Sequence, residues 1–272
     1  MINDRKTKLD YLRQNLRKIG SLVVAFSGGV DSTFLVAVAH EELGDRLLAV
    51  TATSPIHPEY ERLEAMKLAS SLGIRHKIVE SNELEIENFR KNPTNRCYYC
   101  KKALFAIIKD VAAMHGICVV ADGTTVDDLS DYRPGKLAAK EMGIISPLLE
   151  ADIGKEEIRT FSSEMGLATA SKPSFPCLAS RIPYGSEITK EKLKAVDSVE
   201  RSLHNMGFGQ MRVRHHGDIA RIELDVKQIN MACNLEMRER MVKAARSAGF
   251  TYVTLDLEGY RTGSLNIRIE DM

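Results

Sequence analysis

The sequence has 272 residues, of which 44% are hydrophobic and 28% charged, which excludes a disordered or fibrous protein and allows one large core or two moderate ones. Lys and Arg number 38 against 37 Asp and Glu, so the formal net charge of +1 creates no field that would draw nucleic acid or an anionic membrane without specificity. No stretch approaches the roughly 18 apolar residues of a membrane span, so we expect no membrane partner, and the balanced charge argues against a nucleic-acid partner. The few cysteines, odd in number, favour a reducing compartment, and we expect a cytoplasmic protein.

The first 150 residues alternate short β-branched runs with amphipathic stretches, a pattern typical of a parallel sheet covered by helices. Leu9, Leu12 and Leu16 recur at helical spacing and predict a leading helix, from about residue 6 to residue 18, that packs on the sheet. The other predicted elements are strands near Ser21–Phe26, Leu47–Thr53, His76–Glu80 and Ile117–Ala121, and helices near Ser32–Leu43, Pro58–Leu72 and Cys100–His115.

A loop-rich connector follows, because three prolines and a glycine fall within the short span from Pro173 to Gly185. Beyond it, the pattern predicts a helix, two strands, a helix and a strand over Thr189–Met206, Gln210–His215, Asp218–Asp225, Leu235–Ala248 and Thr251–Asp256. The predicted fold class is therefore α/β: a parallel-sheet domain over 1–170, a connector over 171–188 and a smaller α+β domain over 189–272.

A glycine-rich turn joins the first strand to the first helix of the predicted sheet. The run is Ser27-Gly28-Gly29-Val30-Asp31-Ser32, in which the glycines allow backbone N–H groups to turn toward an anion. No lysine follows the glycines, so the turn is not a Walker A loop. The carboxylate of Asp31 beside phosphates is understandable if it holds a bridging Mg²⁺. The residues predicted to bind the phosphates are Ser27, Gly28, Gly29, Asp31 and Ser32.

This hexapeptide resembles the SGG-x-DS loop of the PP-loop ATP pyrophosphatases, a superfamily that adenylates a substrate and releases pyrophosphate. The resemblance implies that Thr51 and Thr53, where the second strand ends, border the adenine of ATP. It also implies an ATP and Mg²⁺ site at the end of the fourth strand, since ligands bind beyond the carboxyl ends of parallel strands. Its candidate residues are Asp122, Gly123, Asp128 and Arg133; the alternative is a solvated acidic turn.

Five cysteines at low density do not suggest a disulfide scaffold. Cys118 and Cys233 are most simply interpreted as small buried hydrophobic residues. Cys97 and Cys100 open a helix, where the helix dipole favours thiolates, and with Cys177 they offer three ligands. Three thiolates and one open position suit a [4Fe–4S] cluster whose free iron could bind sulfide. Zinc with a different fourth ligand, a redox pair and unligated thiols remain alternatives.

A predicted hairpin in the C-terminal domain gathers arginines. If His216-Gly217 is its tip, Arg214 lies opposite Ile219, Arg212 opposite Arg221 and Gln210 opposite Glu223, all on one side. Neighbouring guanidinium groups repel one another unless an anion or a carboxylate neutralises them. This face predicts a small substrate with phosphate or several carboxylates, and the alternative is an ordinary solvated charged face.

Four segments resemble the ATP-dependent sacrificial sulfur transferases, the LarE family, over nearly the whole chain. They are Asp131–Gly135, Pro176–Gly185, the hairpin Arg212–Glu223 and Tyr252–Arg261. The resemblance implies adenylation of pyridinium-3,5-dicarboxylate mononucleotide and its conversion to thiocarboxylates during synthesis of the nickel-pincer nucleotide of lactate racemase. It further implies catalytic or substrate-binding roles for Cys177, Asp31, Ser180, Arg181, Arg212 and Arg214, and an acidic metal site with Glu200 and Glu223.

Two departures qualify the resemblance. Met231 stands where a further acidic residue of the metal site is expected, and Cys97 with Cys100 is absent from members that sacrifice one cysteine sulfur. The chain therefore resembles the cluster-dependent branch, and the expected cofactors are ATP, Mg²⁺ and a [4Fe–4S] cluster. The expected partners are a small nucleotide substrate, a sulfide donor, other proteins of nickel-pincer synthesis and further copies of the chain. Alternatives are a PP-loop tRNA thiolase, an ammonia-dependent amide synthetase and a non-catalytic sensor of ATP and a cluster.

Overall fold

The computed structural model describes residues 2–130, 134–173 and 176–261, and its internal contacts divide the chain into two units. The first unit comprises Met1–Asn82 and Cys97–Phe175, and the second comprises Glu83–Arg96 and Pro176–Met272. The second unit therefore includes the segment 83–96, which the sequence analysis left in the N-terminal domain. No helix in these described ranges is long and apolar enough to cross a membrane.

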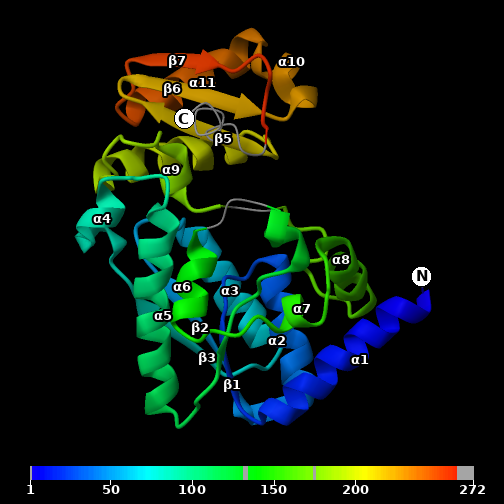
Figure 1. The fold of residues 1–272 in the computed structure, drawn as a ribbon. Helices are drawn as coiled ribbons and strands as arrows, with labels where there is room; N and C mark the ends of the chain where they lie inside the picture. Colours follow the sequence, from blue (N-terminus) through cyan, green and yellow to red (C-terminus); the bar gives the residue numbers. More distant parts are fainter. Residues whose placement is uncertain (1, 131–133, 174–175, 262–272) are drawn as a thin grey trace. The chain divides into compact units, whose positions relative to one another are not determined.

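A parallel sheet forms the centre of the first unit, as predicted, and its strand order is β3-β2-β1-β4 (Figure 1). Its strands are β1 (Leu22–Ala25), β2 (Leu47–Thr53), β3 (His76–Glu80) and β4 (Val120–Ala121). The helices are α1 (Ile2–Ile19), α2 (Val30–Leu43), α3 (Glu59–Ser71), α5 (Arg96–Met114), α6 (Gly135–Glu141), α7 (Pro147–Glu150) and α8 (Lys155–Glu164), with 3-10 turns η1 (Gly44–Arg46) and η3 (Val126–Ser130).

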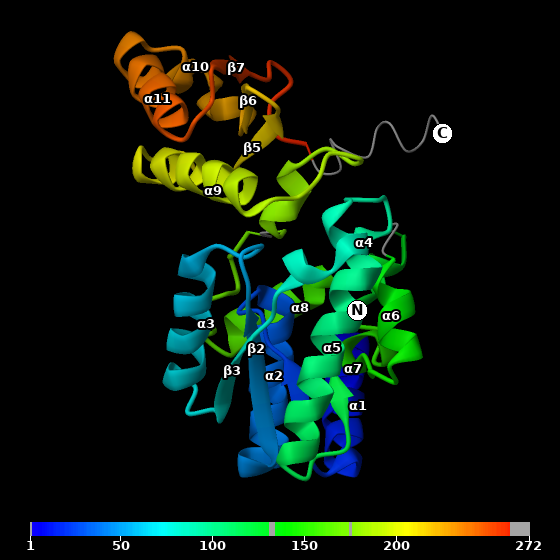
Figure 2. The same cartoon turned by 90° about the vertical axis from the view of Figure 1, so that its left-hand side faces the viewer.

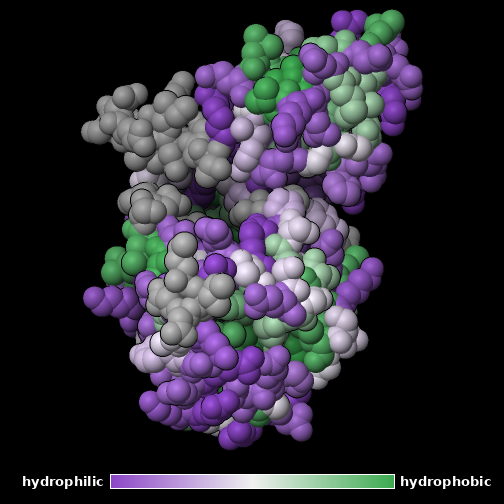
Figure 3. Space-filling model, turned by 90° about the vertical axis from the view of Figure 1, so that its right-hand side faces the viewer, coloured by the Kyte–Doolittle hydropathy of each residue, from purple (hydrophilic) through white to green (hydrophobic). Residues whose placement is uncertain are grey.

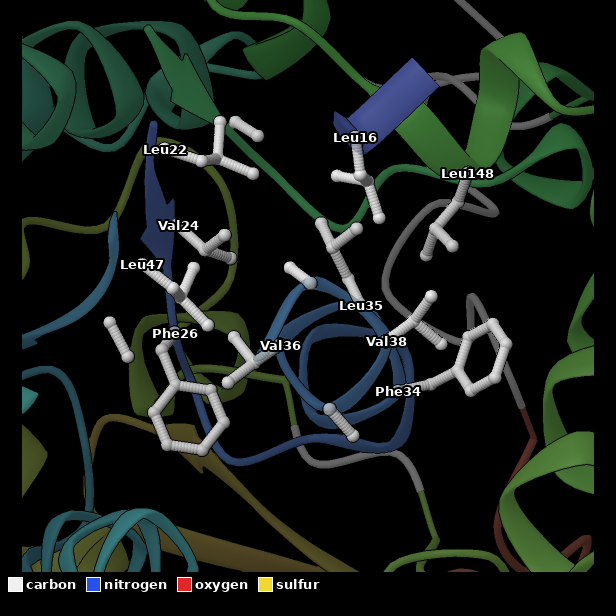
Figure 4. Packing of buried hydrophobic residues seen from close by; sticks show 14 of the residues in the cluster. Leu16, Leu22, Val24, Phe26, Phe34, Leu35, Val36, Val38, Leu47 and Leu148 are labelled. Atoms are coloured by element: carbon white, nitrogen blue, oxygen red, sulfur yellow. The ribbon is translucent and has the colours of Figure 1, made fainter. Parts of the chain in front are cut away.

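Helices cover both faces of this sheet. Successive residues of a strand point to opposite faces, so apolar side chains stand on each face and are buried by a helix layer there. Leu22 and Val24 of β1 pack with α1, α2 and α8, whereas Val23 packs with α5 on the other face. Helices α5 and α6 lie side by side (Figures 1 and 2). The apolar side chains of α2, among them Phe34 and Val36, are surrounded by the core (Figure 4). This packing fixes the N-terminus of α2 at the end of β1.

Two cysteines contradict the sequence interpretation. Cys118 and Cys233, expected to be buried, are both exposed. The predicted fourth strand began at Ile117, but only Val120–Ala121 pairs with β1, so Cys118 precedes the strand and lies outside the core. Cys233 follows the short helix α10 (Ile229–Ala232), whose last residue is buried while the next points outward.

The second unit contains a three-stranded sheet with the order β5-β6-β7. Helix α9 buries its apolar side, including Leu193, Val196 and Leu203, and contacts both β5 and α11. The elements of this unit are η2 (Glu83–Glu85), α4 (Glu87–Arg90), η4 (Leu178–Arg181), α9 (Lys190–Asn205), β5 (Met211–His216), β6 (Ile219–Leu224), η5 (Val226–Gln228), α10, α11 (Leu235–Ser247) and β7 (Tyr252–Leu255). The five predicted helices and strands beyond residue 188 are all present.

The hairpin β5–β6 has a register that differs by two residues from the prediction. Arg212 lies opposite Glu223 and Arg214 opposite Arg221, because the two-residue loop is Gly217-Asp218 and not His216-Gly217. Gly217 has a φ of +63°, and a two-residue hairpin loop favours glycine at a central position with positive φ. A shift by two residues keeps every side chain on its predicted face.

Hydrophilic side chains cover most of the surface in the view of Figure 3, and hydrophobic ones form small separate groups. Isolated exposed apolar residues are ordinary for a globular protein.

Candidate functional site

The glycine-rich turn Ser27–Ser32 of the first unit, which we call the phosphate loop, is held together by its own hydroxyl groups. The Oγ atoms of Ser27 and Ser32 lie 3.1 Å apart, and Ser32 Oγ also accepts from the Ser27 N–H at 3.3 Å. Gly29 donates its N–H to Ser27 Oγ at 3.3 Å. Gly28 has a φ of +70°, and a Cβ there would lie 3.1 Å from Ala65 Cβ of α3. The backbone thus takes a path that requires glycine and brings α3 against the loop.

The loop leads directly into α2, which begins at Val30 with Gly29 as its N-cap. The N–H groups of a first helical turn have no partners within the helix, and the helix dipole favours negative charge there. Asp31 stands in this turn, and Ser32 beside it is buried. Hydroxyl groups, backbone donors and one carboxylate are a donor set that fits the phosphates of ATP and a Mg²⁺ ion.

The end of β4 lies against this turn. A Cβ on Gly123 would be 3.1 Å from the backbone N of Ser32, so only glycine allows this close approach. Asp122 is buried and accepts from Ser146 Oγ at 2.7 Å and Thr124 Oγ1 at 2.8 Å. Its carboxylate therefore holds the loop after β4 in place, and the solvated acidic turn considered as an alternative is wrong for this residue.

Asp128 is buried too and accepts from the Thr125 N–H at 3.0 Å, while its other oxygen lies 3.2 Å from Lys155 Nζ. It stabilises the 3-10 turn η3 after β4. Arg133 falls outside the described residues. The proposed contacts of Asp122, Gly123, Asp128 and Arg133 with ATP remain predictions.

The threonines at the end of β2 make bonds within the protein. Thr51 Oγ1 donates to the Phe26 carbonyl at 2.7 Å and lies 2.8 Å from His76 Nε2, and Thr53 Oγ1 donates to the Val79 carbonyl at 3.3 Å. Burial lowers the pKa of His76 below its ordinary value, so this imidazole is neutral at neutral pH. The adenine contacts expected at Thr51 and Thr53 remain predictions.

Lys172, which the sequence analysis did not single out, contacts the phosphate loop. Its Nζ donates to the Gly28 carbonyl at 2.9 Å and to Glu64 Oε2 at 2.8 Å. The sequence offered one signal for such a contact: the phosphate loop itself contains no lysine.

In the second unit, hydrogen bonds from Arg181 hold the segment around Cys177 in place. Its side chain is 1% exposed and makes a two-pronged ion pair with Glu200, with N–O distances of 2.8 and 2.7 Å. Another guanidinium nitrogen donates to the Cys177 carbonyl at 3.1 Å and to Ser180 Oγ at 3.0 Å. The pair with Glu200 thereby fixes the backbone that carries the Cys177 thiol.

Arg212 and Arg214 of the hairpin are buried as well, so the alternative of a solvated charged face is wrong for these two, whereas Arg221 is partly exposed. Arg214 donates to the Ser180 carbonyl at 2.8 Å and pairs with Glu223 at 2.7 Å. Arg212 is 1% exposed and stacks on the ring of Tyr260, 4.9 Å from its centroid. Burial, and next the guanidinium of Arg181, lower the pKa of Arg212. We call Arg181, Arg212 and Arg214 with Glu200 and Glu223 the arginine cluster.

The candidate cysteine ligands are divided between the two units, with Cys97 and Cys100 in the first and Cys177 in the second. Cys97 is exposed and Cys100 half-buried in the first turn of α5, and Cys177 is half-buried just before η4. Within the described ranges, no three His, Cys, Asp or Glu side chains are grouped so that they could hold a metal ion. Glu200 and Glu223, predicted to bind a metal, instead form ion pairs with arginines. All these metal assignments remain predictions.

A second set of contacts joins the segment 83–96 to the loop 182–186. The Asn92 side-chain amide lies 2.8 Å from the Pro183 carbonyl and 2.9 Å from that of Ser186, and its carbonyl oxygen accepts from Arg96 at 2.6 Å. The Arg96 guanidinium lies 4.3 Å from the centroid of the Tyr184 ring. The residue that precedes Cys97 is therefore bound to the loop that follows Cys177 and η4.

Comparisons with known proteins agree with this geometry. The model of the NAD synthase family matches residues 5–102, which include the phosphate loop. The chain is 38% identical to pyridinium-3,5-bisthiocarboxylic acid mononucleotide synthase of Lactiplantibacillus plantarum, covering 96% of this chain and 94% of that protein. It is 44% identical to the uncharacterized protein slr1717 of Synechocystis, over 96% and 97% of the two chains. The chain belongs to the LarE family of PP-loop, ATP-dependent sulfurtransferases.

Proposed function

We propose that this protein adenylates the carboxylates of pyridinium-3,5-dicarboxylate mononucleotide and replaces an oxygen of each with sulfur, in the synthesis of the nickel-pincer nucleotide. The observation that carries the proposal is the Ser27–Ser32 loop at the start of α2, in a chain related over nearly its full length to a synthase of the bisthiocarboxylic acid product. Activation by ATP suits this chemistry, because a carboxylate is a poor electrophile and its adenylate is a good one.

In the proposed first step, a carboxylate oxygen of the substrate attacks the α-phosphorus of ATP. The bond from that phosphorus to the oxygen bridging to the β-phosphorus breaks, and pyrophosphate leaves with the electron pair. Ser27, Ser32 and the first-turn N–H groups of α2 hold the pyrophosphate, and Asp31 would hold Mg²⁺. These groups are in place before the reaction, so they neutralise the developing charge without reorganising.

In the second step, a sulfur nucleophile adds to the activated carbonyl carbon and AMP leaves with the electron pair. Cys177 is the proposed sulfur carrier, as the resemblance to the LarE family implies, and the paired Arg181 and Glu200 fix its backbone. If the Cys177 sulfur is itself transferred, the bond from Cβ to sulfur breaks, the α-proton is lost and dehydroalanine remains. If sulfide is the nucleophile, the cysteine is unchanged.

The arginine cluster is the proposed binding region for the substrate phosphate. Burial and the neighbouring Arg181 lower the pKa of Arg212, so its positive charge is held at a cost in free energy. An anionic ligand beside Arg212 would relieve this cost. Arg212 and Arg214 are therefore the residues proposed to discriminate a nucleotide from a simple carboxylic acid.

The reaction is tested with the protein, Mg·ATP and the dicarboxylate nucleotide, with and without sulfide. We expect mass spectrometry to detect a thiocarboxylate product, and AMP to form only when the dicarboxylate is present. An amide product, or sulfur transfer to added tRNA, would contradict the proposal. Dehydroalanine at position 177 after one turnover would identify the sacrificial route, and repeated turnover with sulfide would identify the other.

The [4Fe–4S] cluster predicted at Cys97, Cys100 and Cys177 is tested separately by anaerobic reconstitution. We expect about four irons per chain in the wild type, the count for such a cluster. Replacing any one of these three cysteines by alanine should abolish iron binding, whereas Cys118→Ala and Cys233→Ala, at exposed positions, should retain it. Iron binding that survives Cys177→Ala would contradict the three-cysteine assignment.

A further inference from the structure

A lysine distant in sequence lies next to the phosphate loop, which contains no lysine of its own. Lys172 follows α8 and lies 144 residues after Gly28, yet its Nζ is 2.9 Å from the Gly28 carbonyl oxygen. The same Nζ is 2.8 Å from Glu64 Oε2 on α3. Lys172, Gly28 and Glu64 all belong to the first unit, so this contact is internal to one packed body.

The backbone of Lys172 is fixed by several hydrogen bonds. Its N–H donates to the Thr169 carbonyl at 2.9 Å, and its carbonyl accepts from Arg159 at 2.9 Å. Arg159 also donates to the Ala170 carbonyl at 2.6 Å, so one guanidinium on α8 holds two successive parts of the segment. A cation whose backbone is already ordered loses less conformational entropy when it binds a ligand.

The Lys172 ammonium group is positioned to bind an anion at the phosphate loop. An ammonium group has three N–H donors, and the Gly28 carbonyl and Glu64 accept two of them. The Lys172 side chain is 18% exposed, whereas that of Glu64 is 49% exposed. Water screens the ion pair on the Glu64 side, so the pair is weak enough for a phosphate oxygen to replace the carboxylate.

We propose that Lys172 binds the polyphosphate of ATP at the phosphate loop, and that Glu64 is the carboxylate that a phosphate oxygen displaces from Lys172. This inference rests on the proposed use of ATP. It assigns a cation to a loop that contains none, and it makes Glu64 a competitor of the nucleotide for Lys172. Lys172 would neutralise charge on the pyrophosphate, and AMP alone, which lacks that group, would bind independently of Lys172.

The proposal predicts effects of opposite sign for the two partners. Lys172→Gln should weaken binding of Mg·ATP and of pyrophosphate by about tenfold or more, the range expected for a lost hydrogen bond to a charged group. The same variant should leave AMP affinity unchanged, and Lys172→Arg should restore part of the ATP affinity. Glu64→Gln should strengthen ATP binding severalfold, because the competitor is gone. Lys67→Gln, an exposed position on the same helix α3, is the matched control and should change nothing.

Calorimetric titration of the full chain with ATP, pyrophosphate and AMP separates the outcomes, without the carboxylate substrate so that no turnover occurs. Equal weakening of all three ligands by Lys172→Gln, or weakening by Glu64→Gln as well, would make the contact a structural brace and overturn the proposal. Unchanged ATP binding in Lys172→Gln would overturn it too, while leaving the proposed function intact. A wild type that binds no ATP would contradict the proposed function itself. Should Lys172→Gln not fold, Lys172→Arg and Glu64→Gln still give the predicted signs.

Discussion

The phosphate loop and the arginine cluster are both proposed to hold anions, but they are built differently. The loop uses backbone and hydroxyl groups of six consecutive residues, Ser27–Ser32, and the packing of α2 holds them in place. The arginine cluster uses long charged side chains from η4, α9, β5 and β6, and two of its arginines, Arg181 and Arg214, are paired with carboxylates. Substitutions in the loop should therefore affect chemistry more than folding, whereas those in the cluster should affect folding of the second unit first.

The largest expected effect is on catalysis. Asp31→Asn removes the carboxylate proposed to hold Mg²⁺ and should reduce AMP formation about a hundredfold or more, the loss typical of a missing electrostatic stabiliser. The free energy of unfolding should change little, because Asp31 stands in the first turn of α2 and not in the core. Asp45→Asn, at an exposed position, is the control. Normal AMP release by Asp31→Asn would remove this residue from the mechanism.

Substitutions in the arginine cluster should instead lower the free energy of unfolding and leave ATP binding unchanged. Glu200→Ala leaves the buried guanidinium of Arg181 without its carboxylate and should lower the free energy of unfolding by about 3–5 kcal/mol, the usual loss when one partner of a buried pair is removed. Urea denaturation measures this loss, with the exposed Glu239→Ala as its control. ATP affinity of the folded protein should stay the same. A loss below about 1 kcal/mol would class the pair with exposed salt bridges.

A smaller loss of unfolding free energy is expected at the contacts of the segment 83–96 with Pro183 and Ser186. Asn92→Ala removes an amide that contacts the backbone carbonyls of Pro183 and Ser186, and we expect a loss of about 1–3 kcal/mol. The φ of +56° at Asn92 adds to the loss, because alanine is strained in this region. Asn92→Gly separates the two causes, since glycine relieves the strain without restoring the bonds. Destabilisation no larger than that of Asn88→Ala, an exposed position in the same segment, would show that these contacts contribute little.

The smallest expected effect is on pH dependence. Burial lowers the pKa of His76 in the folded state, so the unfolded chain binds the proton first as the pH falls. The stability contributed by the neutral imidazole is present above the ordinary pKa of about 6.5 and is lost below it. Unfolding midpoints near pH 7.5 and near pH 5.5 should therefore differ less in His76→Asn than in the wild type. Exposed His115→Asn should behave like the wild type, and an equal pH response in His76→Asn would refute the assignment.

Features that depend on neighbours in sequence could be predicted. The bounds of β2 and β3 are as predicted, because β-branched runs flanked by turns define a buried strand, and the phosphate loop is a contiguous motif. The hairpin register depends on which of the two loop positions Gly217 occupies, and the prediction placed it second where the structure has it first. The sequence did indicate the observed loop, because type II′ hairpin turns favour glycine at the first of their two central positions.

Features that depend on distant contacts could not be predicted. The contact of Asn92 with Pro183 joins residues 91 positions apart, and that of Lys172 with Gly28 joins residues 144 apart. No local propensity encodes either contact. The burial of Arg212 and Arg214 likewise depends on Glu223 and Tyr260, whose positions follow only from the folded second unit. A charged strand face looks the same in sequence whether it is solvated or paired.

The proposed activity depends on one reaction, adenylation of a carboxylate at the Ser27–Ser32 loop. The direct measurement is the release of AMP and pyrophosphate from ATP when pyridinium-3,5-dicarboxylate mononucleotide is added to the protein with Mg²⁺. We predict that the two products form in equal amounts, that neither forms without the dicarboxylate, and that Asp31→Asn forms both about a hundredfold or more slowly. Release of ADP and phosphate, or AMP formation that does not depend on the dicarboxylate, would contradict the account.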